Sequence, residues 1–268
     1  MKNLMFALIF LFPLILFSQE RLEKAKESLS SNNSTTTWEE TKSNRSSRSG
    51  RINRNRDNDG LFIAIVEDVG FYLFYGAIIG DSEYRTLTPY PYFNNSTGEY
   101  LKIDTIQSKS SLFKISVNQL FNRGVNGIEF NANYRVLPIL GIEASHLNFS
   151  ENSIQGKEYL DITSFLLKYY RIREQNVSVW WGMGASYVAN EVQTWGFSYA
   201  IGTEIFPVKP ISLETSYKQS FINYNNVNEF KIHLKYHIKK TALYTGYHAN
   251  KLGSEKANGI VFGAEYTF

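Results

Sequence analysis

Residues 126–136 read Asn-Gly-Ile-Glu-Phe-Asn-Ala-Asn-Tyr-Arg-Val, and this stretch decides the fold. Its even-numbered positions from Ile128 to Val136 are apolar, whereas its odd-numbered positions from Glu129 to Arg135 are polar. Side chains alternate between the two faces of a β-strand, so one face of this segment is apolar and the other is polar. The period of two predicts a strand and not a helix.

The same alternation recurs to the end of the chain. The fourth repeat changes phase near Ser164, where a β-bulge would bring its two halves onto one face. We predict an all-β antiparallel fold of about ten strands, with eight or twelve as alternatives. The predicted strands span 111–121, 126–136, 139–149, 158–171, 176–189, 193–206, 210–221, 228–239, 241–249 and 257–268.

Composition separates a membrane barrel from a soluble sheet. A soluble sheet would crowd Lys and Glu on its polar face, but here that face mixes glycines such as Gly182, Gly184 and Gly196 with charges of both signs. The apolar face is rich in aromatic residues, in a chain with 18 Tyr and 19 Phe. Small and charged residues inside, with aromatic residues outside, are typical of a transmembrane β-barrel. A soluble sandwich or barrel is the alternative.

Connection lengths give a second test of this interpretation. Alternate connections near 137–138, 173–175, 207–210 and 238–241 are short, whereas 150–157, 222–228 and 250–258 are longer and rich in Asn, Gly and Ser. Outer-membrane barrels have short periplasmic turns and longer outer loops. An even number of strands also returns the C-terminus to the side on which the barrel begins.

The N-terminal part of the chain divides into three segments. Residues 1–18 combine a short basic start with an apolar run, which predicts a cleaved signal peptide. Residues 19–59 are rich in Ser, Asn and Arg, and we predict a disordered basic tether because they offer little apolar surface to bury. Residues 60–110 form an uncertain helix or loop segment packed at the barrel, and 111–268 form the barrel itself. Because the chain has no cysteine, disulfides, thiolate metal sites and a lipid anchor on an N-terminal Cys are excluded.

The chain ends in Tyr266-Thr267-Phe268 on an amphipathic strand. This ending resembles the C-terminal signal that the outer-membrane assembly machinery recognises. Together with the signal peptide, it makes 111–268 similar to an outer-membrane β-barrel protein of Gram-negative bacteria, and the Ser-Gln-Glu export end and a Tyr-Pro-Tyr loop suggest the Bacteroidota type. The resemblance implies a location in the cell outer membrane, with membrane lipid and the assembly machinery as partners, the latter through Tyr266 and Phe268.

The polar face predicts a charge network in the barrel lumen. Acids and bases are nearly balanced, which favours a lumen that neutralises itself through ion pairs. A barrel near eight strands can be filled by side chains, whereas larger porins leave a channel. The predicted network consists of Lys114, Glu129, Arg135, Glu143, Glu204, Glu214, Lys218, Glu229, Lys231, His233, Lys235, His237 and Glu265, with Lys239 as a further inward base.

No motif in the sequence indicates catalysis. His233 and His237 lie about 13 Å apart along one strand, at about 3.3 Å per residue, which is too far for one metal ion. Some outer-membrane enzymes place a catalytic His with Ser, Asp or Glu at the outer rim of the barrel. The nearest arrangement of this kind here is His248 followed by Ser254 and Glu255. We therefore predict no enzyme activity, cofactor, metal site or nucleic-acid partner.

The sequence thus favours a plugged barrel with a structural or surface-recognition role. A narrow porin-like channel and an outer-membrane rim hydrolase are the alternatives. Tyr90, Tyr92, Tyr100 and Trp195 are candidates for an exposed binding surface, and the partner is not specified by the sequence.

Overall fold

The computed structural model describes residues 20–30, 76, 85–101, 108–122, 124–153 and 156–268. The predicted signal peptide, the basic stretch beyond residue 30 and most of 60–84 lie outside the described residues. Among those that are described, no helix is long and apolar enough to cross a membrane. The elements that precede the barrel are short: α2 (Arg21–Ser30), β1 (Thr86–Leu87), the 3-10 turn η2 (Phe93–Asn95) and β2 (Tyr100–Leu101).

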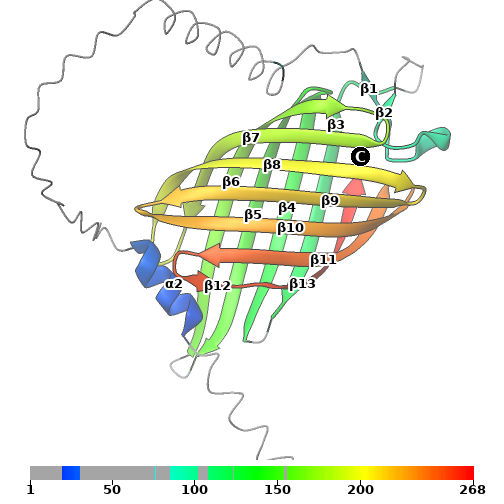
Figure 1. The fold of residues 1–268 in the computed structure, drawn as a ribbon. Helices are drawn as coiled ribbons and strands as arrows, with labels where there is room; N and C mark the ends of the chain where they lie inside the picture. The colour runs from blue at the N-terminus through cyan, green and yellow to red at the C-terminus, as the bar shows by residue number, and fades with distance from the viewer. Residues whose placement is uncertain (1–19, 31–75, 77–84, 102–107, 123, 154–155) are drawn as a thin grey trace, which may run out of the picture. The chain divides into compact units, whose positions relative to one another are not determined.

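Ten strands of the described chain form a closed antiparallel barrel (Figure 1), as the alternation predicts. Consecutive strands pair along the chain, β13 pairs with β3, and β11 lies between β10 and β13, so the sheet closes on itself. A short β12 (Glu255–Lys256) folds back on β11. The ten strands are β3 (Leu112–Phe121), β4 (Val125–Leu137), β5 (Leu140–Ser153), β6 (Gly156–Arg173), β7 (Val177–Val188), β8 (Thr194–Val208), β9 (Ile211–Ile222), β10 (Asn225–Ile238), β11 (Thr241–Leu252) and β13 (Gly259–Thr267).

The barrel is apolar outside and polar inside. On β4, Phe130 is 57% exposed on the outer surface, whereas its neighbour Glu129 is 2% exposed and points into the lumen. Exposed large apolar side chains continue this outer belt on every barrel strand, with Met183 on β7 and mostly Phe, Ile, Leu, Tyr, Val and Trp on the others. A water-soluble barrel would have the reverse arrangement, and an apolar outer band around a polar interior is the arrangement of a transmembrane barrel.

The two open ends of the barrel, its rims, differ. The turn rim carries the connections 138–139, 174–176, 209–210 and 239–240, together with Phe268. The helix rim carries the connections 122–124, 154–155, 189–193, 223–224 and 253–258, together with α2. In Figure 1, α2 lies beside β12 at one end of the barrel, and β1 and β2 lie near the C-terminus at the other.

Two of the long loops predicted at the helix rim are mostly strand. β5 and β6 continue until only residues 154–155 separate them, and β9 and β10 are joined by residues 223–224. These hairpins extend beyond the apolar belt, and their outer face is in contact with water there. Polar residues can therefore continue the backbone hydrogen bonding of the two strands. Of the three connections predicted to be long, only the last remains so, as 253–258, and the connection 189–193, which was not among them, is of similar length.

The β-bulge predicted near Ser164 is wrong. The register between β5 and β6 is continuous through Ser145↔Ser164, and the irregularity on β6 occurs instead against β7, between Tyr170 and Ile172. Leu160 and Ile162 point into the barrel, whereas Phe165 points out. The phase change arises because the lumen itself is apolar near the helix rim, so apolar residues occupy opposite faces in the two halves of one regular strand.

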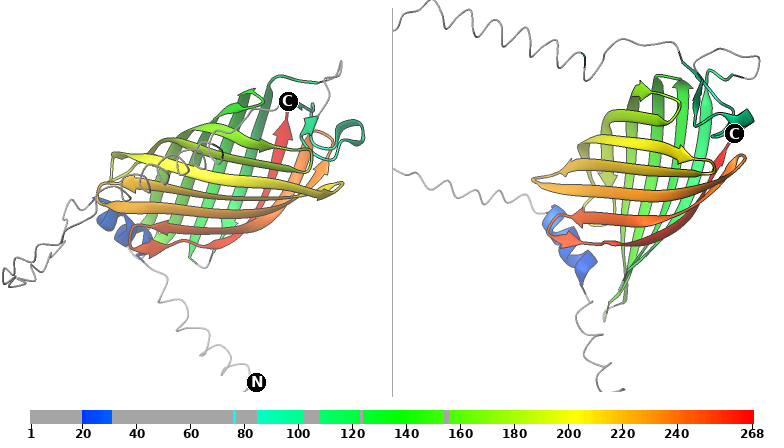
Figure 2. Two further views of the ribbon diagram at one scale, coloured as in Figure 1. Left: turned by 45° about the horizontal axis from the view of Figure 1, so that its top comes forward. Right: turned by 45° about the vertical axis from the view of Figure 1, so that its right-hand side comes forward.

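The prediction of a disordered tether from residue 19 is wrong for residues 21–30, which form α2. Leu22, Ala25 and Leu29 recur at helical spacing on one face of α2, and all three are buried. A helix of this length is marginal alone in water, so its stability comes from packing against the barrel. Figure 2 shows α2 against the helix rim in two further views.

Candidate functional site

The charged residues predicted for the lumen all lie inside the barrel, except Lys239, which is exposed in the turn after β10. The expectation for Lys239 is wrong because β10 ends at Ile238, and the next residue already belongs to the reversal of the chain. Apart from His237, the residues of the predicted network surround one central cavity. Arg135, Glu129 and Glu229 are among its buried members.

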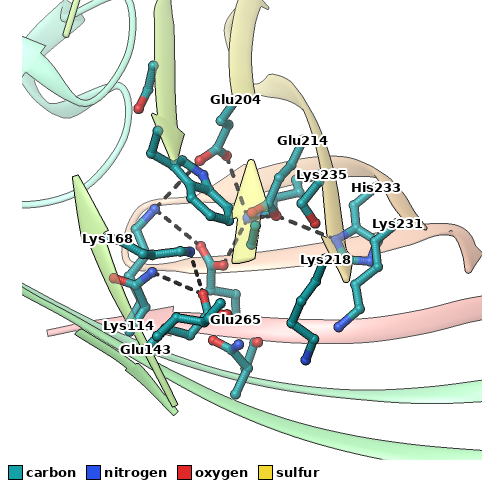
Figure 3. A pocket seen from close by; sticks show the side chains of 18 of the residues that line it. Lys114, Glu143, Lys168, Glu204, Glu214, Lys218, Lys231, His233, Lys235 and Glu265 are labelled. Atoms are coloured by element: carbon teal, nitrogen blue, oxygen red, sulfur yellow. Dashed lines mark hydrogen bonds and ion pairs between the residues drawn. The ribbon is translucent and has the colours of Figure 1, made fainter. Parts of the chain in front are cut away.

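Lys235 is the centre of one group of ion pairs. Its ammonium nitrogen lies 2.8 Å from a Glu214 oxygen, 2.9 Å from Glu265 and 3.5 Å from Glu204. These acids come from three other strands, β9, β13 and β8, so the pairs join separate parts of the barrel wall (Figure 3). Unlike charges attract strongly in a poorly solvated interior, and this group therefore ties the wall together across the lumen.

A second group of ion pairs lies on β4, β9 and β10. Lys218 Nζ is 2.8 Å from Glu229, which also lies 3.2 Å from Lys231, and Lys231 pairs in addition with Glu129. Lys168 pairs with Glu143 on the neighbouring strand and lies 3.5 Å from the centre of the Trp180 ring. Lys168 and Trp180 were missed by the sequence analysis, although both occupy inward positions of the alternation.

Glu99 is a lumen residue that sequence analysis could not find. It precedes β2 at the turn rim, is 0% exposed, and pairs with Lys114 and, at 2.5 Å, with Arg135. Burial alone would raise the pKa of this carboxyl, but the Arg135 guanidinium and the Lys114 ammonium outweigh it and lower the pKa below the ordinary value of 4.5. No periodic pattern surrounds Glu99, so only the fold reveals its role.

Residues 85–101 cover the turn rim. The Tyr92 hydroxyl donates to the carbonyl of Val208 at 3.2 Å, and its ring packs edge-on against Phe206. Burial, assisted by Glu204, raises the pKa of Tyr92 to about 12. Tyr100 is fully buried and donates to the carbonyl of Pro138 at 3.1 Å. The expectation that Tyr92 and Tyr100 belong to an exposed binding surface is therefore wrong, because both are packed inside the rim.

The helix rim is filled by an apolar seat that receives α2. Leu22, Ala25 and Leu29 of α2 share one buried cluster with side chains from most of the barrel strands. The lumen is thus divided into an apolar layer at the helix rim and a charged layer below it. The apolar seat consists of Leu120, Val125, Leu147, Phe149, Leu160, Ile162, Val188, Val192, Ile222, Val227, Leu252, Ala257 and Val261.

Polar contacts fix both the flank and the start of α2. Lys26 lies 2.5 Å from Glu158 on β6 and 2.7 Å from Glu191 in the connection 189–193. Burial would lower the pKa of Lys26, but these two carboxylates raise it above the ordinary value of 10.5. At the start of α2, the Leu22 amide donates to the Glu151 carboxylate at 2.9 Å. Such a contact satisfies one of the free amides of a helix N-terminus.

The last turn of α2 is capped by side chains of the barrel. The Asn223 amide donates to the Leu29 carbonyl, and Asn225 donates to the carbonyl of Ser28. The Ser28 hydroxyl in turn accepts from the backbone amide of Ser254 at 3.2 Å. Helix C-termini leave carbonyls without helical partners, and these bonds satisfy two of them. They also fix the position of the end of α2 on the helix rim.

The space left between the two rims is small. The central cavity has a volume of about 90 Å³. A water molecule takes about 30 Å³ in the liquid, so the cavity has room for a few waters between the ion pairs. The cavity is lined by charged and hydrogen-bonding side chains.

The interior histidines are held in hydrogen bonds. The Nε2 atoms of His233 and His248 are 2.7 Å apart, and His233 Nδ1 lies 3.5 Å from Glu214. His237 Nε2 lies 2.7 Å from the Ser212 hydroxyl. The interpretation of His248 as a rim residue is wrong, since its side chain is fully buried in the lumen. In the described part of the chain, no group of three or more His, Asp or Glu could hold a metal ion.

Four buried serines form a second feature that sequence analysis missed. Ser186 lies 2.7 Å from both Ser164 and Ser198 and 2.9 Å from Ser220, measured between hydroxyl oxygens. Lys218 donates to Ser164 at 2.8 Å and links these hydroxyls to the charge network. All four serines occupy inward positions on adjacent strands, and this parity was the only available signal.

Tyr266 and Phe268, near the end of the chain, lie on the outer surface of the barrel. Phe268 is 47% exposed, its ring packs 5.4 Å from Phe113, and its amide donates to the Phe113 carbonyl. Tyr266 packs edge-on against Phe268. A role for Tyr266 and Phe268 in assembly stays a prediction.

An antiparallel barrel with an apolar outer belt and a polar, charged interior defines the class of transmembrane β-barrel proteins. No family model matches the chain, and no curated protein matches it. Among solved structures it is distantly similar to a de novo designed transmembrane β-barrel, at 12% identity over 60% of this chain and 98% of that chain, with a TM-score of 0.32.

Two natural barrels match at a similar level. The N-terminal β-barrel domain of Pseudomonas aeruginosa OprF is 8% identical over 60% of this chain and 98% of its own, with a TM-score of 0.30. The outer membrane protein Ail of Yersinia pestis is 15% identical over 59% of this chain and 98% of its own, with a TM-score of 0.33. These matches are distant, and the function proposed below rests on the side chains of this chain.

Proposed function

We propose that this protein is an integral outer-membrane β-barrel of a Gram-negative bacterium whose lumen is closed, with a structural or surface-recognition role. The observation that carries the proposal is the occupation of both rims by the chain's own residues. The α2 helix fills the apolar seat, residues 85–101 cover the turn rim, and about 90 Å³ remains between them. An ion crossing this barrel would have to displace an apolar layer and separate buried ion pairs, and each step is costly.

Planar-bilayer recording on the refolded full-length protein tests the closed lumen. We expect no stable conductance from the wild-type protein. Frequent ohmic openings would refute the proposal and favour a narrow channel. A rim hydrolase has less support, because His248 is buried and its imidazole contacts His233 and not the loop that contains Ser254 and Glu255.

The orientation of the barrel follows from its connections. Short turns of outer-membrane barrels face the periplasm, so we assign the turn rim to the periplasm and the helix rim to the cell exterior. The exposed face of α2 and the connections 189–193 and 253–258 would then be available to a surface partner.

Single-cysteine labelling tests this orientation, and the absence of native cysteine keeps the background low. Lys24 is exposed on α2, and Lys239 is exposed on the turn rim. A membrane-impermeant maleimide added to whole cells should label Lys24→Cys but not Lys239→Cys, and it should label both in lysed cells. Labelling of Lys239→Cys alone in whole cells would invert the assignment.

A further inference from the structure

A polar hollow at the helix rim lies between the start of α2, the connection 122–124 and the segment that contains β12. Figure 1 shows α2 beside β12 at this rim. The hollow has a volume of about 440 Å³, and none of its lining residues belongs to the apolar seat or to the central cavity. The lining consists of Arg21, Asn122, Ser254, Glu255, Lys256 and Asn258.

Every side chain of this lining is polar, and several have no partner within the protein. In the part of the chain that the structure describes, the side chains of Asn122, Lys256 and Asn258 make no hydrogen bond or ion pair. A typical small-molecule site is mostly apolar with a few polar groups, and this hollow has the opposite character. An apolar ligand would take these polar groups out of water without giving them hydrogen bonds, which is unfavourable. The hollow is therefore suited to a hydrophilic ligand.

Positive charge outweighs negative charge around the hollow. Arg21 and Lys256 contribute to the lining, against the single carboxylate of Glu255. Lys251 on β11 lies directly opposite Lys256 on β12 in the register of the two strands, and both lysines are exposed. Like charges directly opposite each other destabilise a pair of strands, and a bound anion would offset their repulsion. This arrangement favours a ligand that carries negative charge.

Glu255 distinguishes a compact anion from a larger one. An ionised carboxylate accepts hydrogen bonds and donates none, so it would repel a phosphate or sulfate ion in the same hollow. It is compatible with an anion that also carries hydroxyl groups, because these can donate to it. Asn122 and Asn258 add amide donors and acceptors. A carboxylate and several hydroxyls in one molecule are the chemistry of an acidic sugar.

We infer that this hollow binds an acidic sugar residue of a surface polysaccharide. The sugar carboxylate lies between Arg21 and Lys256, and a guanidinium group can donate two parallel hydrogen bonds to it. The sugar hydroxyls donate to Glu255 and exchange hydrogen bonds with Asn122 and Asn258. The inference rests on the proposed surface-recognition role and names the class of partner that the helix rim would recognise.

Isothermal titration calorimetry on the full-length protein, refolded in detergent micelles, tests the inference. The ligand is a linear trisaccharide of galacturonate, and its matched control is the same trisaccharide with the carboxylates reduced to alcohols. We expect the acidic trisaccharide to bind and the neutral one to bind about tenfold more weakly, the scale of one charge-assisted hydrogen bond. Inorganic phosphate and a peptide of three aspartates should also bind more weakly, because neither combines a carboxylate with several hydroxyls.

Lys256→Gln is the main variant. It should weaken binding of the acidic trisaccharide by about tenfold, because it removes one cation from the hollow. Arg21→Gln should act in the same direction, but Arg21 is also the first residue of α2, so Lys256→Gln gives the clearer result. Lys240→Gln removes an exposed lysine from the turn rim and should leave the affinity unchanged, which makes it the matched control.

Equal affinity for the acidic and the neutral trisaccharide, or unchanged affinity in Lys256→Gln, would overturn the inference. Tighter binding of phosphate would assign the hollow to a compact anion, and tighter binding of the aspartate peptide would assign it to a protein partner. Either result would also overturn the acidic sugar. Binding in micelles does not depend on the orientation in the membrane. Labelling of Lys239→Cys alone in whole cells would therefore refute the exterior position of the helix rim without changing the result for the hollow.

Discussion

Replacing Leu29 with alanine is expected to loosen α2 from the apolar seat without unfolding the barrel. Leu29 is fully buried in the cluster that joins α2 to the strands. Leu→Ala at such a position typically costs 2–5 kcal/mol, and we take about 3 kcal/mol for this site. Because about 1.4 kcal/mol corresponds to a factor of ten, the population with α2 undocked should rise by about a hundredfold.

Cysteine accessibility measures this population directly. Ala25 is 0% exposed on the docked face of α2, so a thiol at Ala25→Cys reacts with a maleimide only when α2 leaves the seat. When docking is fast compared with labelling, the labelling rate is proportional to the undocked fraction. Leu29→Ala should therefore accelerate labelling of Ala25→Cys by about a hundredfold.

Two controls separate undocking from other causes. Lys24→Cys lies on the exposed face of α2, so it should label at the same rapid rate with or without Leu29→Ala. Leu29→Met conserves volume and should change the rate for Ala25→Cys by much less. If Ala25→Cys labelled at the same rate with Leu29 intact as with Leu29→Ala, the reasoning that the apolar seat holds α2 would be refuted.

Three further predictions concern Glu99 at the turn rim and Gly202 in the barrel wall. Glu99→Gln leaves Arg135 and Lys114 buried without their closest carboxylate, so the free energy of unfolding in urea should fall by about 3 kcal/mol. Because the folded-state pKa of Glu99 is below its ordinary value of 4.5, this contribution is present above pH 4.5 and is lost as the pH falls through the folded pKa. The stability difference between wild type and Glu99→Gln should therefore shrink below pH 4.5, and a difference that stays constant to strongly acidic pH would contradict this assignment. Gly202→Ala places a Cβ 2.5 Å from the Trp180 ring and should cost about 1–3 kcal/mol in the same urea titration, whereas unchanged stability would show that the ring can move aside.

The strand pattern is the part of the fold that the sequence determines most directly. From β3 to β13, each predicted strand overlaps an observed one, because the face of a side chain on a strand depends on local parity alone. The separation of Phe130 outside from Glu129 inside was readable for the same reason. That rule misled at β6, where Leu160 and Ile162 are apolar but face an apolar part of the lumen.

The roles of the groups that cover the two rims could be found only from the tertiary structure. Lys26 contacts Glu158 across 132 positions of sequence, and Arg135 contacts Glu99 across 36. Neither Lys26 nor Glu99 belongs to the long alternating region, and the composition around α2 is polar enough to predict disorder. Their roles appear only when the closed barrel creates an apolar seat at one rim and places buried cations near the other.

For the histidines and serines of the lumen, the sequence likewise indicates the face of each side chain, and the tertiary structure decides its contacts. Parity places His233, His248 and Ser186 on inward positions, but it does not determine which inward side chains meet. The contact between His233 and His248 joins adjacent strands, and that between Ser186 and Ser220 joins strands that are not direct neighbours in the sheet. Apart from the first half of β6, the sequence by itself therefore determined which residues face lipid and which face the lumen, because that choice is local. The pairing of the lumen residues was decided by the curvature and closure of the barrel, which bring distant strands within hydrogen-bonding reach.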